Sequence, residues 1–358
     1  MKRLKNVLMA PNISCGYLYF YIHLITEICS FYYLSSAIGN NAYLWVLPLI
    51  YDTLAFTPQS IFGYLSDRYP KIPLGLIGAI LIVIALFISP INLGKYTAVI
   101  ILCLGNALIH VNGAEVTLRS SKGKLSHSAI FVSGGSFGVI AGKILGDLNV
   151  SRYIIIVLAL TMITFILLAE TYRPKNKKLK EYHYHNPKIS KGLLIILAVI
   201  IVVIRGYMGY GIPTSWNKTI IESIFLYSFM GLGKALGGIL SDLIGMKKVA
   251  YLSIIGALPF LLIGNNLMII SLIGVMLFSM TMSVTLGLLV SVLKKAPGLA
   301  FGLTTIGLFL GTIPIFFIQI SSYVTNSIII TISTLLCLVI VKYIIRGEKD
   351  EQYQSNIS

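Results

Sequence analysis

The sequence predicts an all-α polytopic membrane protein with twelve transmembrane helices in two pseudo-symmetric six-helix bundles. Three observations lead to this prediction: the composition, the number of apolar segments and a motif that occurs twice. Of the 358 residues, 56% are hydrophobic and only 11% are charged, against roughly 25% charged in an ordinary soluble domain. Because a water-soluble particle needs a charged shell that this chain cannot build, we expect the chain to lie in a bilayer.

The net charge of +16 does not indicate nucleic-acid binding. Lys and Arg form short clusters between apolar runs instead of a stripe that could follow phosphates. The cysteines are scattered in apolar context without metal-ligand spacing, and we expect small core residues at Cys15, Cys29, Cys103 and Cys337. The apolar run after the first five residues lacks a small-residue cleavage site, so we expect a retained first span and no cleaved signal peptide.

Apolar segments of about the length that spans a bilayer occur twelve times along the chain. They lie at 14–36, 42–65, 72–90, 96–116, 126–147, 152–170, 192–212, 219–240, 248–264, 266–290, 297–320 and 325–341. The residues left over form only tails and loops, so no extramembrane catalytic domain is expected. Within span five, glycines recur every fourth residue from Gly134 to Gly146, a spacing that lets two membrane helices approach closely. Pro58, Pro70, Pro213 and Pro314 are expected at kinks or span ends.

The distribution of Lys and Arg predicts the orientation. With a cytoplasmic N-terminus, the inside segments hold 22 Lys and Arg residues and the outside loops hold three, Lys95, Arg152 and Lys218. Cytoplasmic loops carry this excess in membrane proteins. We therefore expect both termini in the cytoplasm and the chain in the cell (inner) membrane.

We expect four regions along the chain: an N-terminal bundle at 1–172, a basic cytoplasmic linker at 173–190, a C-terminal bundle at 191–346 and a cytoplasmic tail at 347–358. The basic run of the linker is expected against anionic lipid headgroups. His183 and His185 in this loop are expected to be solvated, not to bind a metal.

One motif occurs in both halves. The first copy reads Gly63-Tyr-Leu-Ser-Asp67-Arg68-Tyr-Pro-Lys71, and the second reads Gly238-Ile-Leu-Ser-Asp242-Leu-Ile-Gly-Met-Lys247. The aspartates are 175 positions apart, close to half the chain, which predicts parallel repeats. We expect the glycine to permit close packing, the aspartate to accept N–H groups at a helix start, and the basic residues to pair with acids of the other half.

These residues resemble the loop signature of the major facilitator superfamily, and the resemblance covers the whole chain. The second copy departs from the signature, with Leu243 in place of arginine. The resemblance implies two six-helix bundles that rock around a central cavity, with the motif locking the outward-facing state through salt bridges. The gating motif then comprises Gly63, Asp67, Arg68, Lys71, Gly238, Asp242 and Lys247.

A narrower resemblance is to the fosmidomycin-resistance-like exporters. His23-Leu-Ile-Thr-Glu27 is similar to their His-x-x-x-Asp, the stretch Gly105–His110 to their Gly-rich segment that ends in histidine, and Arg205 to an arginine of their seventh helix. Three departures are Glu27 for aspartate, Val111 for proline, and Lys143 after Gly142 where an antiporter motif would have proline. The resemblance favours drug export without establishing it.

Ionisable residues inside the spans are the candidate site, because each costs at least about 2.5–3.5 kcal/mol at bilayer depth. His23 and Glu27 are four apart, so they share a helix face and could exchange a proton, or could form a structural pair. Asp52 is expected to be protonated or to pair with Arg205 or His110. Arg205 could latch the bundles together or hold an anionic substrate group.

Other polar positions have structural alternatives. His110 could face the cavity, whereas Glu115 and Arg119 could pair with each other. Lys143 and Asp147 have the same spacing, and we expect a structural or snorkelling role for them. Lys234 lies in a glycine-rich stretch that is not a nucleotide loop, and it could meet an acid of the first half. The proton-coupling or substrate cavity is predicted from His23, Glu27, Asp52, His110, Arg205 and Lys234.

The function predicted from these residues is secondary active transport of a small solute, coupled to protons, with a lean towards export of a drug or metabolite. The alternative is an importer of a nutrient such as a sugar or organic anion. A membrane-embedded enzyme or a receptor is disfavoured, because the expected catalytic motifs and soluble modules are missing. The predicted partners are a small-molecule substrate, protons and the lipid bilayer, with no nucleic acid, no cofactor and no metal, and the predicted state is a monomer.

Overall fold

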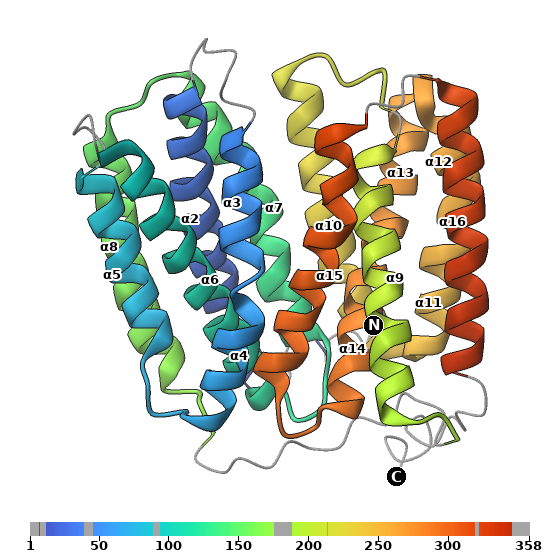
Figure 1. The fold of residues 1–358 in the computed structure, drawn as a ribbon, viewed down its shortest axis with the longest axis horizontal. Helices are drawn as coiled ribbons and strands as arrows, with labels where there is room; N and C mark the ends of the chain where they lie inside the picture. Colours follow the sequence, from blue (N-terminus) through green and yellow to red (C-terminus); the bar gives the residue numbers. More distant parts are fainter. Residues whose placement is uncertain are drawn as a thin grey trace.

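The computed structural model describes residues 7, 12–38, 46–88, 94–174, 188–212, 214–318 and 322–345, and within these ranges it contains helices, turns and loops but no strand. Figure 1 shows the helices standing side by side in two groups, α2 to α8 and α9 to α16. The predictions for the basic run of the linker, for Pro213, for His183 and His185 and for the tail at 347–358 lie outside the described residues.

In the first bundle, seven helices lie within the described residues. They are α2 (Ile13–Ile38), α3 (Val46–Phe56), α4 (Gln59–Arg68), α5 (Leu74–Ile88), α6 (Gly94–Ser120), α7 (Ser126–Asp147) and α8 (Arg152–Glu170). Predicted span two is divided between α3 and α4. The break falls at Thr57 and Pro58, because proline has no N–H to continue the helical hydrogen bonds.

The second bundle repeats this plan with more interruptions. Its helices are α9 (Lys191–Gly211), α10 (Ile220–Ile244), α11 (Met246–Ile254), α12 (Ala257–Ile263), a short 3₁₀ turn (Gly264–Asn266), α13 (Met268–Ser279), α14 (Thr281–Val292), α15 (Pro297–Phe317) and α16 (Tyr323–Ile344). Predicted spans 248–264 and 266–290 are each broken once. Each of the twelve predicted spans therefore overlaps one helix or two consecutive helices.

The helices suit a lipid environment. In the part of the chain that is described, nine segments are long and apolar enough to cross a membrane, and α5 is apolar but shorter. Apolar side chains cover the outer surface: Val157 and Leu167 of α8 are 60% and 56% exposed, and Ile332 and Val339 of α16 are 60% and 64% exposed. Exposing such an apolar surface to water would be unfavourable, whereas lipid tails can pack against it.

A glycine seam joins α2 to α7, as the spacing in span five predicts. Gly134, Gly138, Gly142 and Gly146 lie against the main-chain carbonyls of α2, and a Cβ at any of them would overlap its neighbours. The carbonyls they meet are also spaced by four, at Phe20, Leu24, Ile28 and Tyr32. The absence of side chains on α7 at these positions therefore lets it approach the backbone of α2 closely along this face.

The two bundles meet mainly through two helix pairs, α4 with α15 and α7 with α10, and α15 also contacts α3 and α6. A Cβ at Gly63 of α4 would overlap the carbonyl of Gly298 in α15, and one at Gly238 of α10 would overlap Ala129 in α7. Both motif glycines thus allow close approach across the interface. We call the end of the molecule that carries Asp67 and Asp242 the motif face; α4 and α15 approach each other there, at the lower end of the view in Figure 1.

The glycine seam generates a stability prediction. Gly134→Leu is expected to lower the melting temperature of the purified protein by about 3–10 °C, because a side chain there must displace the backbone of α2, and overpacking costs about 1–3 kcal/mol. Gly192→Leu is the control, since a Cβ at Gly192 meets nothing within 4 Å. Equal melting temperatures for the two variants would refute the close packing of α2 on α7.

Candidate functional site

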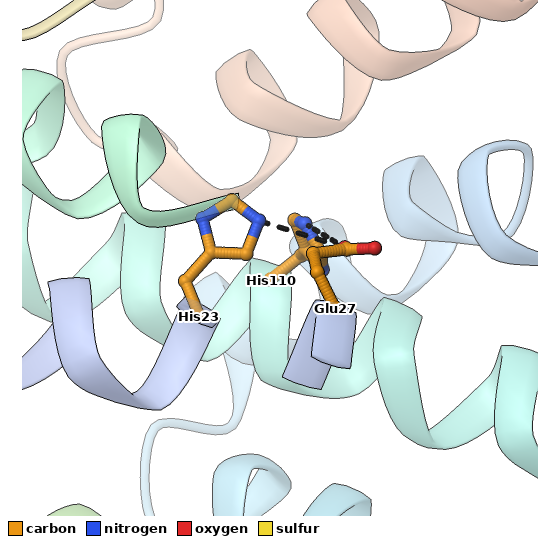
Figure 2. A group of neighbouring side chains, drawn as sticks. All are labelled: His23, Glu27 and His110. Carbon is orange, nitrogen blue, oxygen red and sulfur yellow. Dashed lines mark ion pairs between the residues drawn. The ribbon is translucent and has the colours of Figure 1, made fainter. Parts of the chain in front are cut away.

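Three titratable side chains from two helices meet in the first bundle. His23 and Glu27 lie one turn apart on α2, and His110 reaches them from α6 (Figure 2). Glu27 Oε1 is 3.6 Å from His23 Nε2 and 3.4 Å from His110 Nε2. All three are buried, with exposures of 4%, 6% and 6% for His23, Glu27 and His110. The structure therefore adds His110 to the pair predicted on α2.

Backbone carbonyls orient both imidazoles. His23 Nδ1 lies 3.0 Å from the carbonyl oxygen of Phe131 in α7, and His110 Nδ1 lies 2.9 Å from that of Asn106. A carbonyl oxygen can only accept, so each Nδ1 carries a proton and donates it. Both Nε2 atoms are thereby turned towards the carboxyl group of Glu27.

Tyr51 and Asn106 complete the surroundings of Glu27. Tyr51 OH donates to Glu27 Oε2 at 3.3 Å, and Asn106 Nδ2 lies 3.0 Å from Oε1. The same amide nitrogen is 2.8 Å from Tyr51 OH. Sequence reasoning missed both residues, although Asn106 is four positions before His110 and therefore on the same helix face.

This arrangement can bind and release a proton. With Nδ1 protonated on each ring, a neutral imidazole presents a lone pair from Nε2 to the carboxylate, which also offers only lone pairs. The contacts among Glu27, His23 and His110 become attractive when at least one further proton lies on an Nε2 or on the carboxyl group. The cluster is thus a candidate proton site, with several hydrogen-bond donors and acceptors around it.

The second bundle covers this cluster with an aromatic side chain. The ring of Phe301 in α15 stacks on His110 at a centroid distance of 6.5 Å and lies 6.1 Å from the ring of Phe131. Phe131 in turn packs on His23 at 5.0 Å. The proton site is therefore at the interface between the bundles and not deep inside one of them.

Lys234 reaches the same interface from α10. Its Nζ donates to Ser136 Oγ of α7 at 2.8 Å, and the ammonium interacts electrostatically with Glu27 and with Arg205. The sequence left open whether Lys234 meets an acid of the first half. The structure gives it a hydroxyl of the first bundle as its direct partner and Glu27 at longer range.

Asp52 and Arg205 do not form the pair that the sequence suggested. Asp52 is half-buried on α3 and makes no ion pair with any described residue, and His110 contacts Glu27 instead. Arg205 lines a cavity of about 20 Å³ whose walls all come from the second bundle, Met208 and Phe278 among them. The physical reason is that α3 and α9 are not among the described helix pairs that pack closely together.

The motif aspartates bind helix N-termini of the opposite bundle. Asp67 accepts from the N–H groups of Gly298 and Leu299 at 3.2 and 2.9 Å, at the start of α15. Asp242 accepts from those of Leu125 and Ser126, both at 2.9 Å, at the start of α7. A carboxylate there fills orphan donors and faces the positive end of the helix dipole.

The basic residues of the motif behave differently from the expectation. Arg68 stacks on Tyr69 and donates to Tyr64 OH at 3.1 Å on the exposed surface. Neither Arg68 nor Lys71 nor Lys247 forms an ion pair with a described acid of the partner half. The two halves are joined here by carboxylates on backbone N–H groups and not by the expected salt bridges, because the aspartates meet helix ends.

A chain of ion pairs supports Asp67 from within the first bundle. Arg119 lies 3.0 Å from Asp67 and 2.8 Å from Glu115, which confirms the expected Glu115–Arg119 pair. Arg173 then contacts Glu115 at 2.5 Å and Glu170 at 2.6 Å. Burial raises the pKa of the Asp67 carboxyl to about 6, against the opposing effects of Leu299 and Gly298 N–H and of Arg119.

Arg173 was expected to begin the basic linker, whose basic run was predicted against lipid headgroups, but the structure directs its side chain elsewhere. Its guanidinium turns back into the first bundle and donates to Asn112 Oδ1 at 2.9 Å as well as to the two glutamates. The spacing of Glu170 and Arg173, three residues apart at a helix end, is the signal that could have indicated this pairing.

Lys143 and Asp147 share the i, i+4 spacing but do not bind each other. Asp147 accepts a hydrogen bond from Ser35, whereas Lys143 Nζ donates to Tyr227 OH of α10 at 3.0 Å. The ammonium lies 5.2 Å from the Tyr227 ring centroid and 5.7 Å from that of Phe31. Lys143 therefore joins the bundles farther from the motif face than Lys234 does.

Comparisons with known proteins agree with this architecture. No protein-family model matches the chain. The chain is 23% identical over 255 residues to the fosmidomycin resistance protein of Escherichia coli (strain K12); the match covers 61% of each sequence, so the chain spans less than two thirds of that relative.

Two solved structures share the fold. The human organic anion transporter MFSD10 (TETRAN) superposes with a TM-score of 0.60 and 13% identity, over 94% of this chain and all of that one. The major facilitator superfamily transporter FucP, in the outward conformation, superposes with a TM-score of 0.62 and 13% sequence identity, over 96% of this chain and 100% of that one. The chain is a multi-pass membrane protein with the fold of the major facilitator transporters, which confirms the predicted fold class.

The contacts at the motif face generate a prediction about how closely the two bundles approach each other there. Asp67→Asn together with Asp242→Asn is expected to increase the separation of α4 and α15 at that face, measured as the distance between spin labels on the two helices. Asparagine has one oxygen acceptor in place of two and carries no charge, so each substitution leaves one backbone N–H without its acceptor, and a buried donor without a partner costs about 1–3 kcal/mol. About 1.4 kcal/mol changes a population ratio tenfold. Asp147→Asn is the control, because Asp147 binds Ser35 within its own bundle. An unchanged distance distribution in the double variant would contradict the assigned role of the aspartates.

Proposed function

We propose that the chain is a secondary active transporter that exports a small solute by alternating access, with protons coupled at the His23–Glu27–His110 cluster. The position of that cluster carries the proposal. Its three titratable side chains lie buried where the two bundles meet, and Phe301 of the second bundle covers them. A movement of one bundle against the other changes the access of this proton site.

Alternating access needs contacts that can form and break at the two ends of the interface. At the motif face, Asp67 and Asp242 hold helix ends of the opposite bundle. On the other side of Lys234, Lys143 and Tyr227 hold α7 to α10. Because each of these contacts is a small number of hydrogen bonds, rigid-body rocking can exchange one set for the other.

Protonation supplies the coupling. Without its extra proton the cluster places two imidazole lone pairs against the Glu27 carboxylate, and with the proton these contacts turn attractive. The protonated and the deprotonated cluster therefore favour different positions of Phe301, the side chain of the second bundle that covers the cluster. A proton gradient can then bias the direction of rocking, since a ligand shifts a conformational equilibrium by its differential affinity for the two states.

Orientation and direction complete the proposal. The excess of Lys and Arg in predicted inside loops supports a motif face and both termini on the cytoplasmic side of the inner membrane. The name of the fosmidomycin resistance protein supports export. The transporter works as a monomer, since both bundles come from one chain.

Expression in a fosmidomycin-sensitive bacterium tests the proposal. The wild-type chain is expected to raise the inhibitory concentration of fosmidomycin, and Glu27→Gln is expected to return it to the level of cells without the protein, because an amide cannot take up a proton. Glu222→Gln is the matched control, since Glu222 is an exposed acid at the start of α10. In everted vesicles, a protonophore is expected to abolish fosmidomycin uptake. Full resistance with Glu27→Gln, or uptake that ignores the protonophore, would refute the coupling site.

A further inference from the structure

The ammonium group of Lys234 is incompletely satisfied at the bundle interface. Among the described residues it donates one hydrogen bond, to Ser136 Oγ at 2.8 Å, although an ammonium has three N–H donors. Lys234 sits midway along α10, where water is scarce and an unmatched charge is costly. A group of opposite charge is the partner that this position lacks.

The second bundle has no acid to spare for Lys234. Between residues 191 and 346 the sequence contains two acids, Glu222 and Asp242. Glu222 accepts from the N–H groups of Lys218 and Thr219 in a capping box at the start of α10. Asp242 is bound to the N-terminus of α7. Both acids are therefore committed to helix ends.

The first bundle offers Glu27, but Glu27 already has partners. Its carboxyl group contacts His23, His110, Tyr51 and Asn106, and it interacts with Lys234 only at longer range. Arg205 adds a second positive charge that interacts electrostatically with Lys234. The second-bundle side of the interface is thus positive, and no described carboxylate binds Lys234 directly.

The surroundings of Lys234 combine hydroxyl and aromatic groups. Ser136 follows Gly135, on which the ring of His23 packs, and Phe137 packs against Gly231 one turn before Lys234. Phe131 and Phe301 pack on His23 and His110. An oxygen acceptor beside the ammonium would therefore have the Phe137 ring one helical turn away.

We propose, on the basis of the transport function above, that Lys234 binds the anionic group of the substrate, which is a small organic anion with an apolar remainder. The Lys234–Ser136 hydrogen bond crosses the interface, so it breaks when α7 and α10 separate. In the closed arrangement the Ser136 hydroxyl occupies the acceptor position that a carboxylate or phosphonate oxygen takes when the bundles part. A charged oxygen is the stronger acceptor for an ammonium.

Ligand binding to the purified full-length protein tests this assignment. Phenylphosphonate and benzoate are expected to raise its melting temperature by a few degrees at neutral pH, because a ligand that binds the folded state stabilises it by mass action. Benzyl alcohol, which has the ring without the charge, is expected to have no effect. Lys234→Gln is expected to weaken binding of the anions about tenfold or more, whereas Lys234→Arg keeps the preference for anions.

The matched control is Lys342→Gln, which removes an exposed lysine from the last turn of α16 in the same bundle and is expected to bind the anions as the wild type does. If Lys234→Gln is too unstable to purify, the comparison of anions with benzyl alcohol on the wild type decides. Stabilisation by benzyl alcohol equal to that by the anions, no stabilisation by either anion, or undiminished anion binding by Lys234→Gln would overturn the assignment. If export depends on Glu27 but any of these results is found, the role of Lys234 is refuted and the transport function stands. If the anions bind in a Lys234-dependent way but no export is measured, the transport function is refuted and the anion site stands.

Discussion

The cost of an ionised side chain in a bilayer is the constraint on which this structure depends. A charge at that depth costs at least about 2.5–3.5 kcal/mol, so each one must be matched by a contact. Here the matching groups come repeatedly from another helix or from the other bundle. Glu27 meets His110 of α6, Asp67 meets the start of α15, and Lys234 meets Ser136 of α7. The ionised side chains therefore lie where helices contact each other.

The two motif aspartates make equivalent contacts in the two repeats. Asp67 and Asp242 occupy the same place in the two copies, and each binds two N–H groups at the N-terminus of a helix in the opposite bundle. The motif glycines Gly63 and Gly238 permit the approach, since a side chain at either would overlap the partner helix. A helix start attracts a carboxylate through its free N–H groups and its dipole, so no cation of the partner half is required.

Packing of the first bundle also sets the geometry of the proton site. Along the seam of α2 and α7, glycines at every fourth position of α7 let it approach the main-chain carbonyls of α2 closely. Gly135, beside this seam, makes room for the His23 ring, whose Nδ1 reaches the carbonyl of Phe131. That hydrogen bond turns Nε2 towards Glu27. The protonation chemistry of His23 is thus a consequence of how closely two helices approach.

Composition, periodicity and the repeated motif were enough to predict the all-helical membrane fold and to place His23 and Glu27 on one face of α2, since both depend on residues close in sequence or on average polarity. The structure alone decided which faces meet. It brought His110, Tyr51 and Asn106 to Glu27, moved Lys143 from Asp147 to Tyr227, and turned Arg173 back into the first bundle. The helical repeat determines the direction in which a side chain leaves the axis of its helix. The residue that this side chain contacts depends on the rotation and spacing of the neighbouring helices, which are set by packing of the whole bundle.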